Sequence, residues 1–187
     1  MELERLEIPD VVLITPKRHG DHRGYFMETY SRPKLAGLGI DAVFVQDNQS
    51  RSEHAWTLRG LHFQRPPHAQ GKLVRVVRGR IWDVAVDVRR DSPTYGRWVA
   101  AELSESNAKQ LWVPPGFAHG FVTLEPGTEV AYKVTEVYHP DAEGGVIWND
   151  PELNLPWPID QDPRLSVKDE KLPEFASLES PFVYGDR

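Results

Sequence analysis

The chain has 187 residues, a formal net charge of −6 and no cysteine. Its length suits one domain with its own hydrophobic core, and we predict a single domain over residues 1–187. The lack of cysteine excludes disulfides, thiolate metal sites and a cysteine nucleophile, and the acidic balance argues against a general nucleic-acid surface. The charged N-terminus and the absence of a long apolar run predict neither a secretion signal nor a membrane span, so we expect a cytoplasmic protein.

Sixteen prolines and fourteen glycines divide the chain into short runs rich in β-branched and aromatic residues, a pattern typical of strands. Eleven strands are predicted, at residues 10–16, 25–30, 42–48, 57–64, 72–79, 80–89, 97–103, 109–115, 119–125, 129–138 and 144–150. Helical patterns are confined to short segments at 32–40, 104–110 and 168–175. Many closely spaced strands without alternating helices predict an all-β sandwich, jelly roll or barrel.

The segment 75–88 reads as a hairpin that turns near Gly79. In its second strand the alternation of side chains puts Ile81, Asp83, Ala85 and Asp87 on one face. We expect the two aspartates to pair with arginines and assign them no catalytic role.

The predicted strand "TLRGLHFQ" carries Arg59 and His62, two polar residues that a buried strand holds only if they have partners. Strict alternation puts these two residues on opposite faces, because they are three apart. A bulge at Gly60 would restore a common direction. With such a bulge the cation and the imidazole would face one pocket, but the pattern alone leaves its presence open.

The stretch "VPPGFAHGF" contains Pro114, Gly116 and His119 in the spacing P-x-G-x-x-H. This resembles the second motif of the cupins, double-sheet jelly rolls with a ligand pocket between the sheets. Metal-binding cupins carry H-x-H and then Glu in their first motif, whereas here His62 is followed by Gln64, and Gln70 and Lys72 stand downstream. An amide and a cation do not replace metal ligands, so the expected pocket is metal-free.

A closer resemblance covers about residues 8–169. The fragments "DHRGYFMETY", "VQDNQSRS", "RGLHFQ", "QGKLVRVVRG", "DVAVDVR", "SPTYGRW", "PPGFAHGF", "YKVTEVY", "EGGVIWNDP" and "LSVKD" occur in this order. Together they resemble the dTDP-4-dehydrorhamnose 3,5-epimerases. The resemblance implies an all-β, cupin-like double-sheet jelly roll with a few short helices. It also implies an isomerase of dTDP-L-rhamnose biosynthesis that converts dTDP-4-dehydro-6-deoxy-D-glucose to dTDP-4-dehydro-L-rhamnose without a cofactor.

The chemistry of that reaction needs a base, a cation and an acid. The ketone at carbon 4 acidifies the protons on carbons 3 and 5, so proton removal, enolate stabilisation and proton return suffice. By resemblance His62 is the base and Asp169 fixes its tautomer, which suits imidazole as the side chain that titrates near neutrality. Lys72 would contact the keto oxygen, and Tyr132 would be the acid on the other face of the ring.

The resemblance also implies a binding set and a partner. The expected ligand is a dTDP-linked 4-keto-6-deoxyhexose, and Tyr138 would stack on its thymine. Two of the residues would reach the ligand from a partner subunit, as part of a homodimer with exchanged N-terminal segments: Arg23 and Glu28. The remaining contacts implied are Gln46, Asp47, Asn48, Arg59, His119, Glu143 and Lys168.

Three alternatives remain open at this point. A relative that inverts only one centre, or acts on another keto-sugar, would carry the same motifs. A non-catalytic sugar- or nucleotide-binding jelly roll is disfavoured, because base, orienting acid, cation and proton donor are all retained. A metal-dependent cupin oxygenase is a more distant alternative. The other histidines are given no role: His19, His22, His54, His68 and His139.

Overall fold

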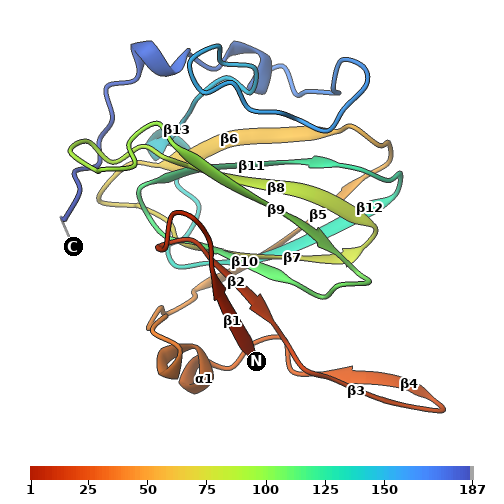
Figure 1. Ribbon diagram of the computed structural model, residues 1–187. Coiled ribbons are helices and arrows are strands. Elements are labelled where there is room, and N and C mark those ends of the chain that lie inside the picture. Colours follow the sequence, from red (N-terminus) through yellow and green to blue (C-terminus); the bar gives the residue numbers. More distant parts are fainter. Residues whose placement is uncertain (186–187) are drawn as a thin grey trace.

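The computed structural model describes residues 1–185, and two facing antiparallel sheets make up most of it (Figure 1). The first sheet has six strands in the order β1 (Glu2–Arg5), β2 (Val12–Thr15), β10 (Gln110–Val113), β7 (Lys72–Arg78), β12 (Thr128–Val134) and β5 (Gln46–Ser52). The second has five strands in the order β13 (Glu143–Gly145), β6 (Leu58–Gln64), β11 (Phe117–Thr123), β8 (Arg80–Asp87) and β9 (Trp98–Ser104). The all-β, double-sheet jelly roll predicted from the sequence is confirmed.

Helical structure is sparse, as predicted. One short helix, α1 (Arg32–Gly37), lies in the first predicted segment, and the C-terminal part contributes the 3-10 turns η2 (Asp169–Lys171) and η3 (Phe175–Ser177). A third turn, η1 (Pro140–Ala142), was not predicted. No helix in residues 1–185 has the length and apolar character needed to cross a membrane.

The helix predicted at 104–110 is wrong. The Asn107 side chain accepts hydrogen bonds from the backbone N–H of Ser104 (3.0 Å) and of Lys109 (2.9 Å), and Ala108 has a φ of 53°. Asparagine and serine side chains compete in this way with helical backbone bonds and favour a turn. The segment therefore forms a tight connection between β9 and β10.

The hydrophobic core follows from strand alternation. On β8, Ile81 and Ala85 face the other sheet in the main core, whereas Val84 and Val86 belong to a second apolar cluster on the outer face of the five-stranded sheet. Residues of the C-terminal segment, such as Phe175, cover that second cluster. The predicted split of β8 into two faces is confirmed.

Gly60 lies in a bulge, the possibility that the sequence left open. His62 of β6 pairs with His119 of β11, but the next registered pair is Arg59 with Phe121, so three residues on β6 span two on β11. Gly60 has a φ of 118°, and a Cβ atom there would lie 2.6 Å from the Cα of Gly120. Only glycine fits this close approach of two backbones. Arg59 and His62 therefore share a face.

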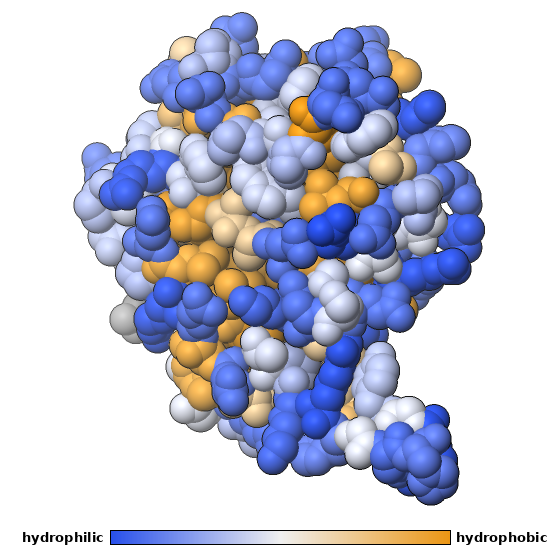
Figure 2. All heavy atoms as spheres, turned by 45° about the vertical axis from the view of Figure 1, so that its right-hand side comes forward, coloured by the Kyte–Doolittle hydropathy of each residue, from blue (hydrophilic) through white to orange (hydrophobic). Residues whose placement is uncertain are grey.

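A two-stranded arm leaves the body of the molecule. Strands β3 (Arg18–Asp21) and β4 (Gly24–Met27) pair only with each other and project beyond the sheets (Figures 1 and 2). The side chains of Tyr25 and Phe26 are 56% and 70% exposed. An isolated hairpin with exposed aromatic residues gains little stability from its own chain.

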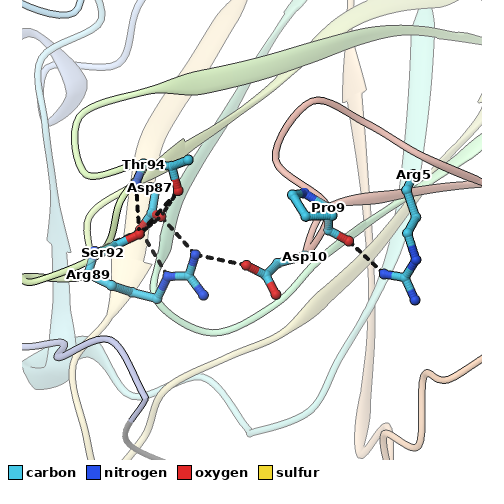
Figure 3. Close-up of polar contacts among 7 residues, drawn as sticks. All are labelled: Arg5, Pro9, Asp10, Asp87, Arg89, Ser92 and Thr94. Carbon is cyan, nitrogen blue, oxygen red and sulfur yellow. Dashed lines mark hydrogen bonds and ion pairs between the residues drawn. The ribbon is translucent and has the colours of Figure 1, made fainter.

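A buried carboxylate, that of Asp87, lies at the C-terminal end of β8 (Figure 3). Asp87 accepts hydrogen bonds from the Arg89 guanidinium, from Ser92 Oγ and from Thr94 Oγ1, the last two at 2.6 Å. Arg89 also contacts Asp10 at 3.0 Å. The predicted pairing of Asp87 with an arginine is confirmed, and its role is structural.

Candidate active site

A cleft between the two sheets holds the polar residues that the core cannot accommodate. It consists of two adjoining cavities, of about 330 Å³ and about 240 Å³. Three side chains line both cavities: His62 from β6, Lys72 from β7 and Tyr132 from β12. These three come from both sheets, so a ligand in the cleft would lie between them.

His62 is held by a carboxylate from the C-terminal segment. Its Nε2 lies 2.6 Å from Oδ1 of Asp169, which is the first residue of η2. Burial opposes ionisation of Asp169, but the hydrogen bonds from His62 and Ser166 hold the pKa of this carboxyl below its usual value. With Nε2–H donating to the carboxylate, the lone pair of Nδ1 is available as a base.

Lys72 carries an ammonium group in a site with little access to water. Its Nζ donates to the backbone carbonyl of His62 at 3.3 Å. Burial lowers the pKa of Lys72 to about 8, and the carboxylates of Asp83 and Glu143 offset part of that effect. The group therefore remains a cation at neutral pH, close to the pH at which it loses its proton.

A second histidine–aspartate pair lies deeper. His119 Nε2 is 2.7 Å from Oδ1 of Asp83, and both side chains are buried. Burial lowers the pKa of His119, and Asp83 counteracts this effect only in part. The other oxygen of Asp83 is buried without a hydrogen-bond partner in the described residues. Our expectation that Asp83 pairs with an arginine is wrong, because its partner is the imidazole next to the site.

Two tyrosines line the cleft: Tyr132, on the sheet opposite that of His62, and Tyr138, at the rim. Burial raises the pKa of Tyr132, so its phenol keeps its proton at neutral pH. Tyr138 is 53% exposed at the rim, and its hydroxyl donates to Glu143 at 3.0 Å. Glu143 also forms an ion pair with Lys168. The rim thus offers a flat aromatic face beside a fixed charge pair.

Arg59 lines the cavity of about 240 Å³ and has spare hydrogen-bonding capacity. Its Nη2 makes only long contacts, of 3.4 Å, to the carbonyl of Arg51 and the hydroxyl of Ser52. Its Nε is buried with no acceptor among residues 1–185. A buried donor of this kind favours an anionic ligand.

The cleft brings most of the sequence-predicted site together. Its walls contain His62, Lys72, Tyr132 and Asp169, together with Gln46, Asn48, Arg59, His119, Tyr138, Glu143 and Lys168. Asp47 is not among them, because alternation along β5 turns it to the opposite face, where it pairs with Lys133 at 2.8 Å. Arg23 and Glu28 also lie outside the cleft: Arg23 pairs with Asp21 on the arm, and Glu28 with Lys34 at 2.7 Å.

The donor set around His62 does not fit a metal ion. The amide of Gln64 donates to the carbonyls of His68 and Val137, and that of Gln70 to the carbonyl of Glu136. Lys72, as a cation, repels a metal.

Sequence reasoning missed the contact of Asp83 with His119, although the alternation on β8 already pointed Asp83 into the space between the sheets.

Comparison with known proteins identifies the chain. Residues 5–177 match the family model described as dTDP-4-dehydrorhamnose 3,5-epimerase. The enzyme of that name from Salmonella typhimurium is 52% identical over 167 residues, which cover 89% of this chain and 91% of that protein.

Solved structures agree with the match in sequence. A Bacillus anthracis dTDP-4-dehydrorhamnose 3,5-epimerase with TDP and PPi bound is 50% identical, with a TM-score of 0.90 over 92% of this chain and 98% of that chain. A Legionella pneumophila dTDP-6-deoxy-D-glucose-3,5-epimerase in complex with dTDP-4-keto-L-rhamnose is 41% identical, with a TM-score of 0.94 over 99% of both chains. The chain therefore belongs to the dTDP-4-dehydrorhamnose 3,5-epimerase family of isomerases.

Proposed function

We propose that this chain converts dTDP-4-dehydro-6-deoxy-D-glucose to dTDP-4-dehydro-L-rhamnose, with His62 as the base, Lys72 as the enolate-stabilising cation and Tyr132 as the acid. One observation carries the proposal: the three side chains line one cleft from two opposed sheets, and Asp169 holds His62 at 2.6 Å. Asp169 acts as a positioning residue, since it touches the imidazole rather than the sugar.

The reaction proceeds through an enolate. Nδ1 of His62 removes the proton from carbon 5 or carbon 3, and the pair of electrons moves onto the oxygen at carbon 4. The Lys72 ammonium stabilises this oxygen, and the phenol of Tyr132 returns a proton to the opposite face of the carbon. Each general acid or base contributes roughly 10²- to 10⁴-fold to the rate, and the enolate cation adds electrostatic stabilisation.

Polar and aromatic residues that line the cleft are proposed to bind the nucleotide. Arg59, whose buried Nε has no acceptor in the described part of the chain, is proposed to contact the diphosphate. The exposed ring of Tyr138 is proposed to stack on the thymine, a contact worth roughly 1–3 kcal/mol in comparable base–aromatic pairs. Gln46 and Asn48, which bond each other at 2.8 Å in the first cavity, would face the nucleotide end.

Deuterium exchange tests the reaction and the base together. The wild-type protein is incubated with dTDP-4-keto-6-deoxyglucose in D₂O, and NMR should show deuterium at carbons 3 and 5. His62→Ala should abolish exchange at both carbons, because one base serves both removals. Exchange at a single carbon in the wild type would indicate an enzyme that inverts one centre. Substantial exchange in His62→Ala would mean that another group is the base.

We further propose a homodimer in which each arm reaches the partner's cleft. The support is that, within residues 1–185, no residue of the arm lines the cleft of its own chain, and that the arm exposes Tyr25 and Phe26. Arg23 and Glu28, on or beside the arm, would thereby contribute to the partner's site.

A mixing experiment tests the exchange of arms. Arg23→Ala has a defective arm on an intact body, and His62→Ala has an intact arm on a defective body. Equal mixing after dissociation should restore about a quarter of wild-type activity, since half of the dimers are mixed and each has one intact site. No recovery, with mixed dimers verified by mass spectrometry, would show that each arm serves its own chain.

The cytoplasmic location stays a prediction, to be tested by cell fractionation.

A further inference from the structure

Two loops at the rim of the cleft bring three metal-ligating side chains together. His68 belongs to the connection between β6 and β7, and Glu136 and His139 to the segment between β12 and η1. One ligand atom from each of the three lies within 4.8 Å of the other two, and all three residues are half-buried. Two imidazoles and a carboxylate are a donor set typical of zinc and other first-row transition ions.

The backbone beneath these side chains is fixed by two glutamines. The buried Gln64 donates to the His68 carbonyl at 2.8 Å and accepts from the His139 N–H at 2.8 Å, so that it joins the two loops. Gln70 donates to the carbonyl of Glu136 at 2.6 Å. Ligands held on a rigid backbone lose little conformational freedom on binding an ion, and this favours a real site over a chance cluster.

The carboxylate is free of competing cations. The ion pair of Glu136 in the described part of the chain is with His139, at 3.7 Å, and no lysine or arginine there lies within 4 Å. One oxygen of Glu136 accepts the N–H of Val137 at 3.0 Å, which orients the carboxylate and leaves its other oxygen for an ion.

The two imidazoles need a modest rearrangement. Their ring centroids are 3.5 Å apart and the ring planes differ by 23°, so the rings stack face to face. An ion lies close to the plane of each imidazole that binds it, so one ring has to rotate out of the stack. The side chain of His139 is 38% exposed, which leaves room for that rotation.

We propose that His68, Glu136 and His139 bind a divalent transition-metal ion of the zinc class, with water completing the coordination. The ion lies outside the reaction, because the enolate is assigned to Lys72. It joins the two loops that Gln64 connects, and so fixes the segment that carries Tyr138. The binding itself does not depend on the function proposed above.

Calorimetry with Zn²⁺ tests this site on the full chain after treatment with a chelator. We expect one ion per chain, with affinity at least tenfold weaker in His68→Ala and in His139→Ala, as for the loss of groups that support or bind a metal. His54→Ala is the matched control, an exposed histidine outside the cluster, and should bind like the wild type. His62→Ala should also bind normally, which separates this site from the catalytic pair.

Spectroscopy identifies the ligands independently of affinity. Cu²⁺ bound to the wild type should give an electron paramagnetic resonance spectrum with coupling to two imidazole nitrogens, and His68→Ala should reduce this to one. Circular dichroism checks that the variants are folded. Absence of Zn²⁺ binding in the wild type, binding that survives loss of both His68 and His139, or binding lost in His62→Ala would each overturn the proposal.

Discussion

The charge state of Lys72 gives the sharpest test of the mechanism. Burial lowers the pKa of this ammonium to about 8, and only the protonated form can stabilise an enolate. At a pKa of about 8, roughly 90% of the groups are protonated at pH 7 and roughly 10% at pH 9. We therefore expect kcat at saturating substrate to fall about tenfold between pH 7 and pH 9. Tyr132 does not contribute to this decline, because burial raises its pKa above the ordinary value of 10.

Removing a carboxylate should move this decline in a known direction. Asp83 is one of two acidic groups that hold the pKa of Lys72 up, so Asp83→Asn should shift the decline of kcat to lower pH and reduce the rate at pH 7. Asp87→Asn is the matched control, because Asp87 is also fully buried on the same face of β8 but bonds Arg89, Ser92 and Thr94 instead. The control should keep the wild-type pH profile, whatever its stability.

The assay is the initial rate of epimer formation at several pH values, with circular dichroism at each pH to verify folding. A kcat that stays constant from pH 7 to pH 9 would refute the assignment of Lys72 as the required cation. A profile that moves equally in the Asp83 and Asp87 variants would show that the shift reflects general destabilisation.

Three further substitutions test other parts of the argument. Tyr132→Phe keeps the ring and its packing, so nucleotide affinity should barely change. NMR in D₂O should show deuterium in unconverted substrate and little epimer, and epimer formed at the wild-type rate would exclude Tyr132 as the acid. Asp169→Asn should stay folded yet lose roughly 10²- to 10⁴-fold in kcat, because an amide orients the imidazole of His62 without stabilising its charge; near-normal turnover would remove Asp169 from the site. Gly60→Ala should lower the free energy of unfolding by about 1–3 kcal/mol or more, because the φ of Gly60 is 118° and a Cβ would lie 2.6 Å from the backbone of Gly120. Urea unfolding measures this change, and an unchanged midpoint would mean that the bulge relaxes freely.

The strands that the sequence predicts well are those rich in buried apolar residues. On β8, which begins at Arg80 as predicted but ends two residues before the predicted limit, one face is apolar and the other carries Asp83 and Asp87, so its two faces could be read in advance. Burial imposes these patterns, and they are therefore visible in the sequence. The bulge at Gly60 could be named only as a possibility, because strict alternation puts Arg59 and His62 on opposite faces and the sequence does not show that they share a pocket.

The strands that the sequence predicts poorly have no apolar face. Residues 46–52, "QDNQSRS", form β5 from polar side chains alone, and we expected that strand four residues earlier, in the apolar run that precedes it. Strands β1 and β3 were missed for the same reason, because each lies at an edge or on the arm and is held by ladder hydrogen bonds. Asp47 was assigned to the site by resemblance, and only the register of β5 shows that it faces the other way.

The pairing of His62 with Asp169 sets an order of events during synthesis. The two residues are 107 positions apart in the chain. At roughly 5–20 residues per second, a ribosome adds Asp169 about 5 to 20 seconds after His62, when all the strands of both sheets have already been made. A nascent chain thus has every strand of its sandwich before it has a working base. The segment beyond β13, made last, both covers the outer apolar cluster with residues such as Phe175 and supplies the carboxylate that completes the catalytic pair.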